Sequence, residues 1–565
     1  MEKEGKMDTE QLKSYCVYEY GCLTPISGET EMTEEIYRKH QLWNQLVELE
    51  HGHRQEVRKI LAVPDDPVAP LVEELKNTRE KIKTARQKAR SGKVDVSVLQ
   101  EQAKILRERL SAAKVEQAEE KRKIKEAGKE KLKELEQERR QAVKVLTKAS
   151  GLYWINYEEV VGNYDLARRR AMKEKTEIKF HRWTGEGKVT IRYQNGLPVE
   201  EVFQRDTRLQ IDPVPQEAWD SPVRGTRRRL ARTLIRLRVR SENRKPVWVE
   251  LPMVMHRPLP PDSEIRLASI IRQRVGRKWR YKAVLTVAVP KRDHIHGKGT
   301  VAIDLGWRQV TDGLRVAYWA DDAGDHGQVV LPLEVLWEFN KLPDLRAIRD
   351  KHFNEIKTGL TEWMAKNVSP DWLKEAAKHL SQWRSQGKLA WLIRQWKESR
   401  FDGDAEIFES LEYWLRRENH LYDWEANLRD QVLRRRREVY RIFAANLTRK
   451  YDTVVLEDFD LRKVTEKSSP EHGTAGVLPA DKQRFIASVS ELRLAIKNAC
   501  SRDGVEVIEI DAKNTTIDCA SCGHSEKWDS ASQIWHTCPA CGKLYDQDEN
   551  ACLNLLNRFA NAPAI

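Results

Sequence analysis

The stretch Cys519–Ala551, CASCGHSEKWDSASQIWHTCPACGKLYDQDENA, combines two Cys-x-x-Cys pairs with an aspartate-rich helix start. The four cysteines are Cys519, Cys522, Cys538 and Cys541, and fifteen residues separate the two pairs. Four thiolates with this spacing are typical of a structural Zn²⁺ site, in which each Zn–S distance is about 2.3 Å. We therefore predict a zinc ribbon near the end of the sequence.

Acidic residues begin a predicted helix directly after the ribbon. Asp546 and Glu549 fit an Asp-x-x-Glu capping box, in which the aspartate is the N-cap. Asp548 lies inside the helix, on the same face as Ala551 and Leu555. Because Ala551 is small, this face can approach a sheet closely. We predict that Asp546 caps the helix and that Asp548 is a metal ligand.

Two further acids end apolar strands. Asp304 ends the apolar run at 301–303, and Glu457 ends the run at 454–456. Strand alternation places Glu457 on the face of Val455 and Asp458 on the opposite face, so we favour Glu457. An acid at the end of a strand can also simply begin a turn, so neither residue is decisive alone.

Together, Asp304, Glu457 and Asp548 fit the ligand set of a two-metal centre. Hydrolysis of a phosphodiester by this route requires carboxylates that hold two Mg²⁺ ions about 3.5–4 Å apart. Hard oxygen ligands suit Mg²⁺, and strand ends hold them rigidly. We predict that these three residues are the catalytic carboxylates.

The charge of the chain indicates an anionic partner. The formal net charge is +13, and the isoelectric point is near 9.1. The arginines that we expect to contact nucleic acid are Arg227, Arg228, Arg229, Arg236, Arg238, Arg240, Arg434 and Arg437. Some of them alternate with apolar residues along 234–240, so a solvated outer face of a sheet is the alternative interpretation.

The remaining pattern predicts several domains, as expected for 565 residues. A helix with an apolar seam runs to about 149, and it is either a solvated spacer or a lobe that lies along nucleic acid. Alternation predicts a small, barrel-like β-domain at 180–295, and 335–450 is mainly helical, with tryptophans in its core. A loop is predicted at 465–480. Neither a secretory signal nor an apolar run of about 20 residues is found, so we expect a cytoplasmic protein without membrane contact.

The order of these motifs resembles the RuvC-like nuclease half of type V CRISPR effectors and of their transposon-encoded TnpB relatives. The stretches that carry this resemblance are 303–306, 455–458, the two Cys-x-x-Cys-Gly pairs and 546–551. Further stretches resemble the compact M subtype of type V, namely 151–154, 256–260, 306–308 and 537–548. The first match covers about 300–560, and the second, looser match extends over most of the chain.

The resemblance implies a multidomain α+β and α/β protein. Its parts would be a helical recognition lobe, a barrel-like wedge domain, and an RNase H-like RuvC domain that contains a helical insertion and a zinc ribbon. The implied segments are wedge 1–29, recognition 30–175, wedge 176–297, RuvC-like 298–334, insertion 335–419, RuvC-like 420–510, zinc-bearing target-nucleic-acid-binding module 511–545 and RuvC-like 546–565. Structural Zn²⁺ and catalytic Mg²⁺ are the implied cofactors.

The resemblance also implies the partners: a guide CRISPR RNA and a double-stranded DNA target with a short adjacent motif, bound by one protein copy in a prokaryotic cytoplasm. M-subtype members bind DNA stably and block transcription without cutting it, and several lack acids at the catalytic positions. This chain retains all three. Three outcomes therefore stay open: silencing by binding, guide-RNA processing at the carboxylate site, and target cleavage by a type V or TnpB-like endonuclease.

Overall fold

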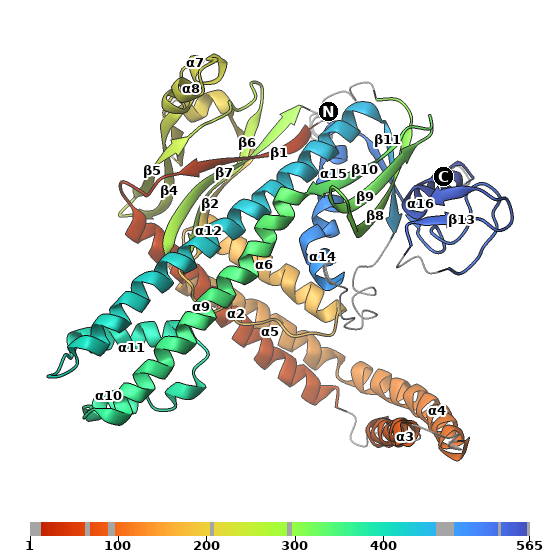
Figure 1. Cartoon of the computed structure of the whole chain (residues 1–565), viewed down its shortest axis with the longest axis horizontal. Coiled ribbons are helices and arrows are strands. Elements are labelled where there is room, and N and C mark those ends of the chain that lie inside the picture. The colour runs from red at the N-terminus through yellow and green to blue at the C-terminus, as the bar shows by residue number, and fades with distance from the viewer. Residues whose placement is uncertain are drawn as a thin grey trace.

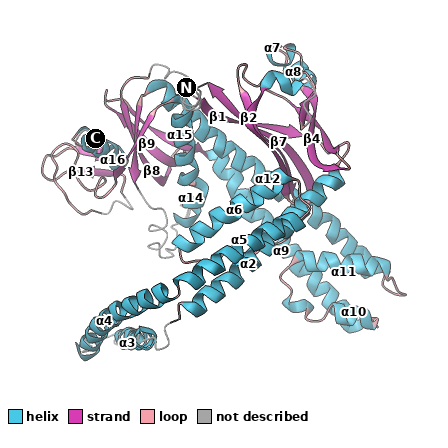
Figure 2. Ribbon diagram, turned by 180° about the vertical axis from the view of Figure 1, so that it is seen from behind, coloured by secondary structure: helices cyan, strands magenta, loops and turns pink. Residues whose placement is uncertain are grey.

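The computed structural model describes residues 13–62, 68–88, 97–203, 208–290, 297–458, 480–528 and 533–561. Two sheets lie on either side of the upper part of the molecule, and long helices run between and below them (Figures 1 and 2). The predicted loop at 465–480 falls, apart from its last residue, outside the described ranges. Within those ranges, no helix is both long and apolar enough to cross a bilayer.

The first sheet has seven antiparallel strands. Their order is β2 (Gly187–Pro198), β6 (Glu264–Val275), β7 (Lys278–Pro290), β1 (Lys13–Cys22), β5 (Lys245–Val254), β4 (Arg232–Glu242) and β3 (Leu209–Ile211). The 3₁₀ helix η1 (Val199–Phe203) contacts both outer strands, β2 and β3, so the sheet curls around one core. Ile235, Leu237 and Val239 of β4 are fully buried in that core.

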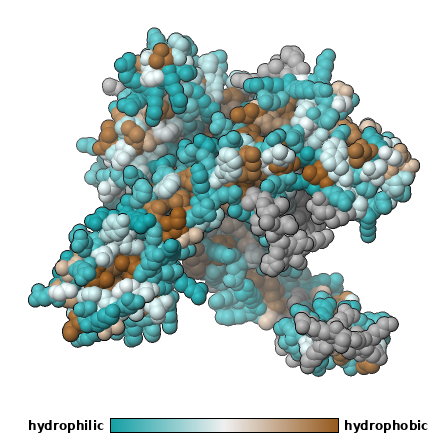
Figure 3. Space-filling model, in the orientation of Figure 1, coloured by the Kyte–Doolittle hydropathy of each residue, from teal (hydrophilic) through white to brown (hydrophobic). Residues whose placement is uncertain are grey.

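Two short helices extend from one end of this sheet. They are α7 (Glu217–Asp220) and α8 (Arg224–Leu230). The sequence predicts only strands here, whereas the arginine-rich segment at 224–230 is helical. The tip that carries α8 is a largely hydrophilic projection (Figure 3).

Five helices form the lobe that follows β1. They are α2 (Glu29–Ile60), α3 (Val68–Lys88), α4 (Ser97–Ala127), α5 (Lys129–Ala149) and α6 (Trp154–Lys173). The predicted seam of α4 packs on α3 through Ala103, Leu106 and Leu110. The α3–α4 hairpin projects away from the rest of the molecule (Figure 1). One long helix to 149 is predicted, but the helix is divided at Gly128, whose low helix propensity suits a break.

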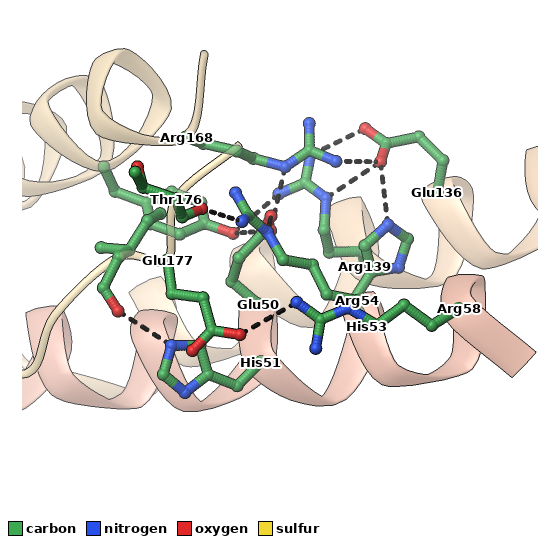
Figure 4. Close-up of polar contacts among 12 residues, drawn as sticks. Glu50, His51, His53, Arg54, Arg58, Glu136, Arg139, Arg168, Thr176 and Glu177 are labelled. Carbon is green, nitrogen blue, oxygen red and sulfur yellow. Dashed lines mark hydrogen bonds and ion pairs between the residues drawn. The ribbon is translucent and has the colours of Figure 1, made fainter. Parts of the chain in front are cut away.

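A buried ionic network joins three helices of this lobe (Figure 4). Glu50 of α2 accepts hydrogen bonds from Arg54, Tyr164 and Arg168 at 2.8–2.9 Å. Arg168 also donates to Glu136 of α5 at 2.9 Å. The network therefore connects α2, α5 and α6, and each charge is paired, as burial demands.

The second sheet has five strands in the order β10 (His326–Pro332), β9 (Gly313–Asp321), β8 (Thr300–Val310), β11 (Thr453–Asp458) and β12 (Glu506–Asp511). The first three strands are antiparallel, and β8, β11 and β12 are parallel. Both faces are covered. One packs on α9 (Leu333–Lys366), α12 (Ala405–Lys450), α14 (Ala480–Ala487) and α15 (Val489–Asp503), and the other packs on α16 (Gln547–Ala560).

A helical insertion lies between β10 and β11. It contains α9, α10 (Asp371–Ala376), the 3₁₀ helix η2 (Leu380–Gln382), α11 (Gln386–Glu398) and the first part of α12. Trp383, Trp396 and Trp414 are buried in its core, as predicted for most tryptophans of this segment, whereas Trp391 and Trp424 are about half exposed. The predicted domain boundary at 419/420 falls inside α12, which is one unbroken helix.

Candidate metal centres

Strand register places the first two predicted carboxylates on one face. In the parallel β8–β11 pair, Ala302 lies opposite Val455. Both residues face α16, where they pack against Leu555. Asp304 and Glu457 lie two residues further along the same strands, so alternation directs them to the same face. The two side chains contact each other there.

The third predicted carboxylate comes from the first turn of α16. Asp546 is the N-cap of this helix and accepts a hydrogen bond from the Asp548 backbone N at 2.9 Å, which confirms its predicted role as a cap. Ala551 and Leu555 are fully buried against the sheet. Asp548 therefore projects from the helix toward Asp304, and both line one cavity of about 170 Å³.

Burial controls the protonation of the strand carboxyls. Asp304 is 9% exposed and Glu457 is 5% exposed. Burial, together with the neighbouring Glu457, raises the pKa of Asp304 well above its usual range. Burial also raises the pKa of Glu457, although its carboxylate accepts from the Leu305 backbone N at 3.2 Å. In the absence of a cation, burial therefore favours the state in which Asp304 and Glu457 share one proton.

Arg315 of β9 occupies the corner of the cavity next to Asp548, and the sequence reasoning missed it. Its Nη1 donates to the Asp548 carboxylate at 2.8 Å and to the Asp546 carboxylate at 2.8 and 3.1 Å. Its Nε donates to Gln328 at 2.9 Å. A signal was present in the sequence, because Arg315 is the only basic residue of the mostly apolar strand β9, and a buried arginine requires an anionic partner.

The ligand oxygens of Asp304, Glu457 and Asp548 do not all lie within 4.8 Å of one another. Within the described residues, only the four cysteines form a group of three or more potential ligands whose atoms all lie within 4.8 Å of one another. Asp304 and Glu457 offer oxygens of the type that Mg²⁺ prefers. Asp548, however, is already ion-paired with Arg315. The cavity is therefore lined by Asp304, which contacts Glu457, and by Asp548, which carries its own counter-charge.

The four cysteines converge as predicted. The Sγ atoms of Cys519 and Cys541 are 3.8 Å apart, and those of Cys522 and Cys538 are 3.6 Å apart. A tetrahedral Zn²⁺ with bonds of about 2.3 Å requires S–S separations of about 3.8 Å, so the donor set fits this ion. Hydrogen bonds from the backbone, that of Cys541 above all, lower the pKa of Cys538 to about 6, which favours the thiolate form.

The two cysteine pairs are built alike. The backbone N of Cys519 donates to His524 O, and that of Cys538 donates to Lys543 O, each at 2.9 Å. Gly523 and Gly542 both have a φ of 73°, a left-handed conformation that glycine adopts without strain. The short strands β13 (Trp535–Thr537) and β14 (Leu544–Asp546) complete the ribbon.

The ribbon is fixed to the helix that carries Asp548. The Asn550 side chain accepts from Ala520 N at 2.8 Å and donates to Asp518 O at 2.8 Å. The Asn554 amide donates to Thr515 O at 2.8 Å. Because β14 leads directly into α16, the cysteine cluster and the third carboxylate belong to one rigid unit.

The eight predicted nucleic-acid arginines fall into two groups. Those already held by other side chains are Arg236 with Asp212 and Glu250, Arg240 with Glu34 and Glu242, Arg434 with Asp430, Arg437 with Glu491, and Arg238 with Ser241 and the Tyr153 ring. Arg227, Arg228 and Arg229 lie exposed on α8, and none of them pairs with a described side chain. These three are the most available for an external anion.

Comparison with known proteins defines the class. Residues 490–555 match the family model "Cas12f1-like, TNB domain". The chain is 49% identical over 558 residues to "CRISPR-associated DNA-binding protein Cas12m" from Thermanaerosceptrum fracticalcis, with 97% of this chain and 94% of that protein covered. It is 35% identical to the protein of the same name from Allomeiothermus silvanus, with 97% of each chain covered.

These matches confirm the resemblance to miniature type V CRISPR effectors. The chain belongs to the Cas12m family. Among solved structures, it is similar to "Cryo-EM structure of the Cas12f1-sgRNA-target DNA complex" over 96% of this chain and 98% of that one, with 12% identity and a TM-score of 0.40.

Proposed function

We propose that this protein is an RNA-guided effector that binds double-stranded DNA and silences it by stable occupancy. A guide CRISPR RNA would supply the sequence through base pairing, and the protein would check a short adjacent motif and hold the strands through phosphate contacts. The observation that carries the proposal is the 49% identity, along 97% of the chain, with a relative named as a CRISPR-associated DNA-binding protein.

Two basic surfaces support this function. The three exposed arginines of α8 extend from the curled sheet, which we propose is the wedge domain. A groove of about 610 Å³ lies between the β6–β7 turn and α12. Its lining includes three arginines and two aromatic residues, together with two acids: Arg182, Arg274, Arg429, Trp183, Tyr422, Glu186 and Asp430. Cationic and aromatic side chains side by side suit backbone phosphates and stacked bases.

The remaining parts have proposed roles in the same complex. The helices α2–α6 would form the recognition lobe, and the five-stranded sheet, with its mixed strand order, would be the RuvC-like domain. The zinc-bound ribbon would contact target nucleic acid beside the carboxylates. One protein copy would act per complex.

A second candidate function is nucleic-acid cleavage, of target DNA or of the guide. The observation that favours it is that Asp304, Glu457 and Asp548, all retained, lie at one edge of the sheet. We rank it second because Arg315 is ion-paired with Asp548 in this cavity. Mg²⁺, held by the carboxylates, would activate water for such a reaction.

One experiment separates these functions. Protein loaded with a matched guide is mixed with an end-labelled duplex, with and without Mg²⁺, and samples are run on native and denaturing gels. Silencing predicts that the duplex is retarded and intact with and without Mg²⁺. With a scrambled guide, it predicts that the duplex is not retarded. Equal retardation with the scrambled guide would refute guided binding. Mg²⁺-dependent cuts that disappear in Asp304→Ala with Glu457→Ala would instead establish the second function.

A further inference from the structure

We propose that Arg315 takes the place of one divalent cation beside Asp548, so that Asp304, Glu457 and Asp548 together bind one ion fewer than three carboxylates would otherwise support. This inference goes beyond DNA binding and does not depend on it. Arg315 would then be the residue that separates a binding protein from a two-metal nuclease.

The first argument is the position of the guanidinium. Nη1 of Arg315 lies 2.8 Å from one oxygen of Asp548 and 2.8 Å from one oxygen of Asp546. It lines the cavity together with Asp304 and Asp548. A two-metal site places a second ion beside this third carboxylate, and here a permanent positive charge already occupies that side.

The second argument is that Arg315 is locked in place. Its side chain is 10% exposed, and its Nε is held by Gln328 at 2.9 Å. The flanking Leu314 and Val316 are fully buried in the core on the other face of the sheet. A guanidinium does not lose its charge at any physiological pH, so a divalent ion can displace it only by moving the side chain.

The third argument is that the backbone of Asp548 is held beside the arginine. Its helix is fixed to the sheet through Ala551 and to the ribbon through Asn550. Asp548 therefore stays within reach of Arg315, and the ion pair is a built part of the cavity. The rival role for Arg315 is to orient Asp548 as a metal ligand, and this role makes the opposite prediction for its removal.

Calorimetric titration of Mn²⁺ into the full-length, zinc-loaded protein, without guide or DNA, distinguishes the two roles. We expect Arg315→Gln to bind one more Mn²⁺ per chain than the parent. Arg308→Gln, which removes the other arginine of the same cavity, is the control for a general charge effect and should stay at the parental value. Arg315→Gln with Asp548→Asn should return to the parental value.

Unchanged stoichiometry and affinity in Arg315→Gln would overturn the proposal, and weaker binding would establish the orienting role instead. If Arg315→Gln folds poorly because Asp546 loses its partner, Arg315→Gln with Asp546→Asn keeps a capping side chain without the buried charge and is expected to show the same extra ion. Because no nucleic acid is present, failure here is distinct from failure of guided DNA binding.

Discussion

Arg277, in the turn between β6 and β7, clasps the carboxylate of Asp423 in the middle of α12. The Arg277 backbone N donates to one carboxylate oxygen at 2.8 Å, and its Nε and Nη2 donate to the other at 3.1 and 2.9 Å. This contact connects the seven-stranded sheet directly to the helix that packs on the five-stranded sheet. The two halves of the molecule are thus joined by side chains as well as by the chain itself.

Removing the clasp should loosen this junction. We expect Asp423→Ala to lower the free energy of unfolding by roughly 1–3 kcal/mol, since three hydrogen bonds to a charged group disappear. The measurement is calorimetric unfolding. Glu177→Ala, which breaks an exposed pair with Arg58, is the matched control and should have a much smaller effect, because water screens that pair. Equal effects of the two variants would contradict a special role for the clasp.

The glycine beside the clasp should tolerate no side chain. Gly276 has a φ of 63°, and an added Cβ would lie 2.4 Å from the Asp423 carboxylate and 3.1 Å from its Cα. Gly276→Ala should therefore destabilise the protein by about 1–3 kcal/mol through backbone strain and displacement of Asp423. Gly52→Ala, in the open middle of α2, should be neutral or stabilising in the same thermal assay.

Acid should weaken the helical lobe through Glu136. A hydrogen bond from Arg139, foremost, lowers the pKa of Glu136 from 4.5 to about 2. A carboxyl with a depressed folded-state pKa stabilises the fold above its unfolded pKa, and this stabilisation is lost as the pH falls from about 4.5 to about 2. The contribution at neutral pH is at most ~3 kcal/mol.

Glu136→Gln should therefore be less stable than the parent at pH 7 and should lose less stability between pH 5 and pH 3. Circular dichroism melts of the protein across this range provide the comparison. Glu130→Gln, at an exposed position of the same helix, should follow the parental pH profile. A Glu136→Gln profile parallel to that of the parent would show that the network does not hold this pKa down.

Loss of zinc should loosen the start of α16, which carries Asp548 of the carboxylate cavity. Cys519→Ser with Cys522→Ser should abolish zinc in an elemental assay, whereas Cys16→Ser in β1 should retain it. Because Asn550 and Asn554 attach the ribbon to α16, we also expect faster hydrogen exchange in the first turns of that helix. Unchanged zinc content in the double variant would refute the four-thiolate site.

The arginines of α8 should dominate the salt dependence of DNA binding. Replacing Arg227, Arg228 and Arg229 by alanine should weaken guided binding and reduce the slope of log K against log salt by up to about 3, close to one for each phosphate that is no longer neutralised. Arg434→Ala with Arg437→Ala should change it less, because both side chains are already ion-paired. A larger change of the slope in the Arg434/Arg437 variant than in the α8 variant would indicate that α12 forms the DNA interface instead.

The sequence predicted those features that depend on local pattern. The cysteine spacing indicated the ribbon, and the apolar runs that end in Asp304 and Glu457 indicated carboxylates at strand ends, because both signals are contained in a few adjacent residues. Arg315 was missed because its importance depends on α16, more than 230 positions away, folding back over β9. The ion pairs of Arg236 and Arg240 were also invisible, because their partners lie on other strands and on α2.

Helix ends also differ in how clearly the local sequence marks them. Gly128 is a weak local signal, and the structure breaks the helix there. The predicted domain boundary at 419/420 lies inside α12, so no helix end marks it. The α8 segment has too few residues for a helical period to show in the sequence.

The unbroken α12 has a mechanical consequence. Its 46 residues span about 69 Å, from the tip of the insertion, past the Arg277 turn, to the start of β11. A stiff rod of this length converts a pivot of about 5° at one end into a shift of about 6 Å at the other. Any ligand that tilts the insertion would thus push on the strand that carries Glu457. Binding at the tip of the insertion would in this way alter the geometry of the carboxylate cavity.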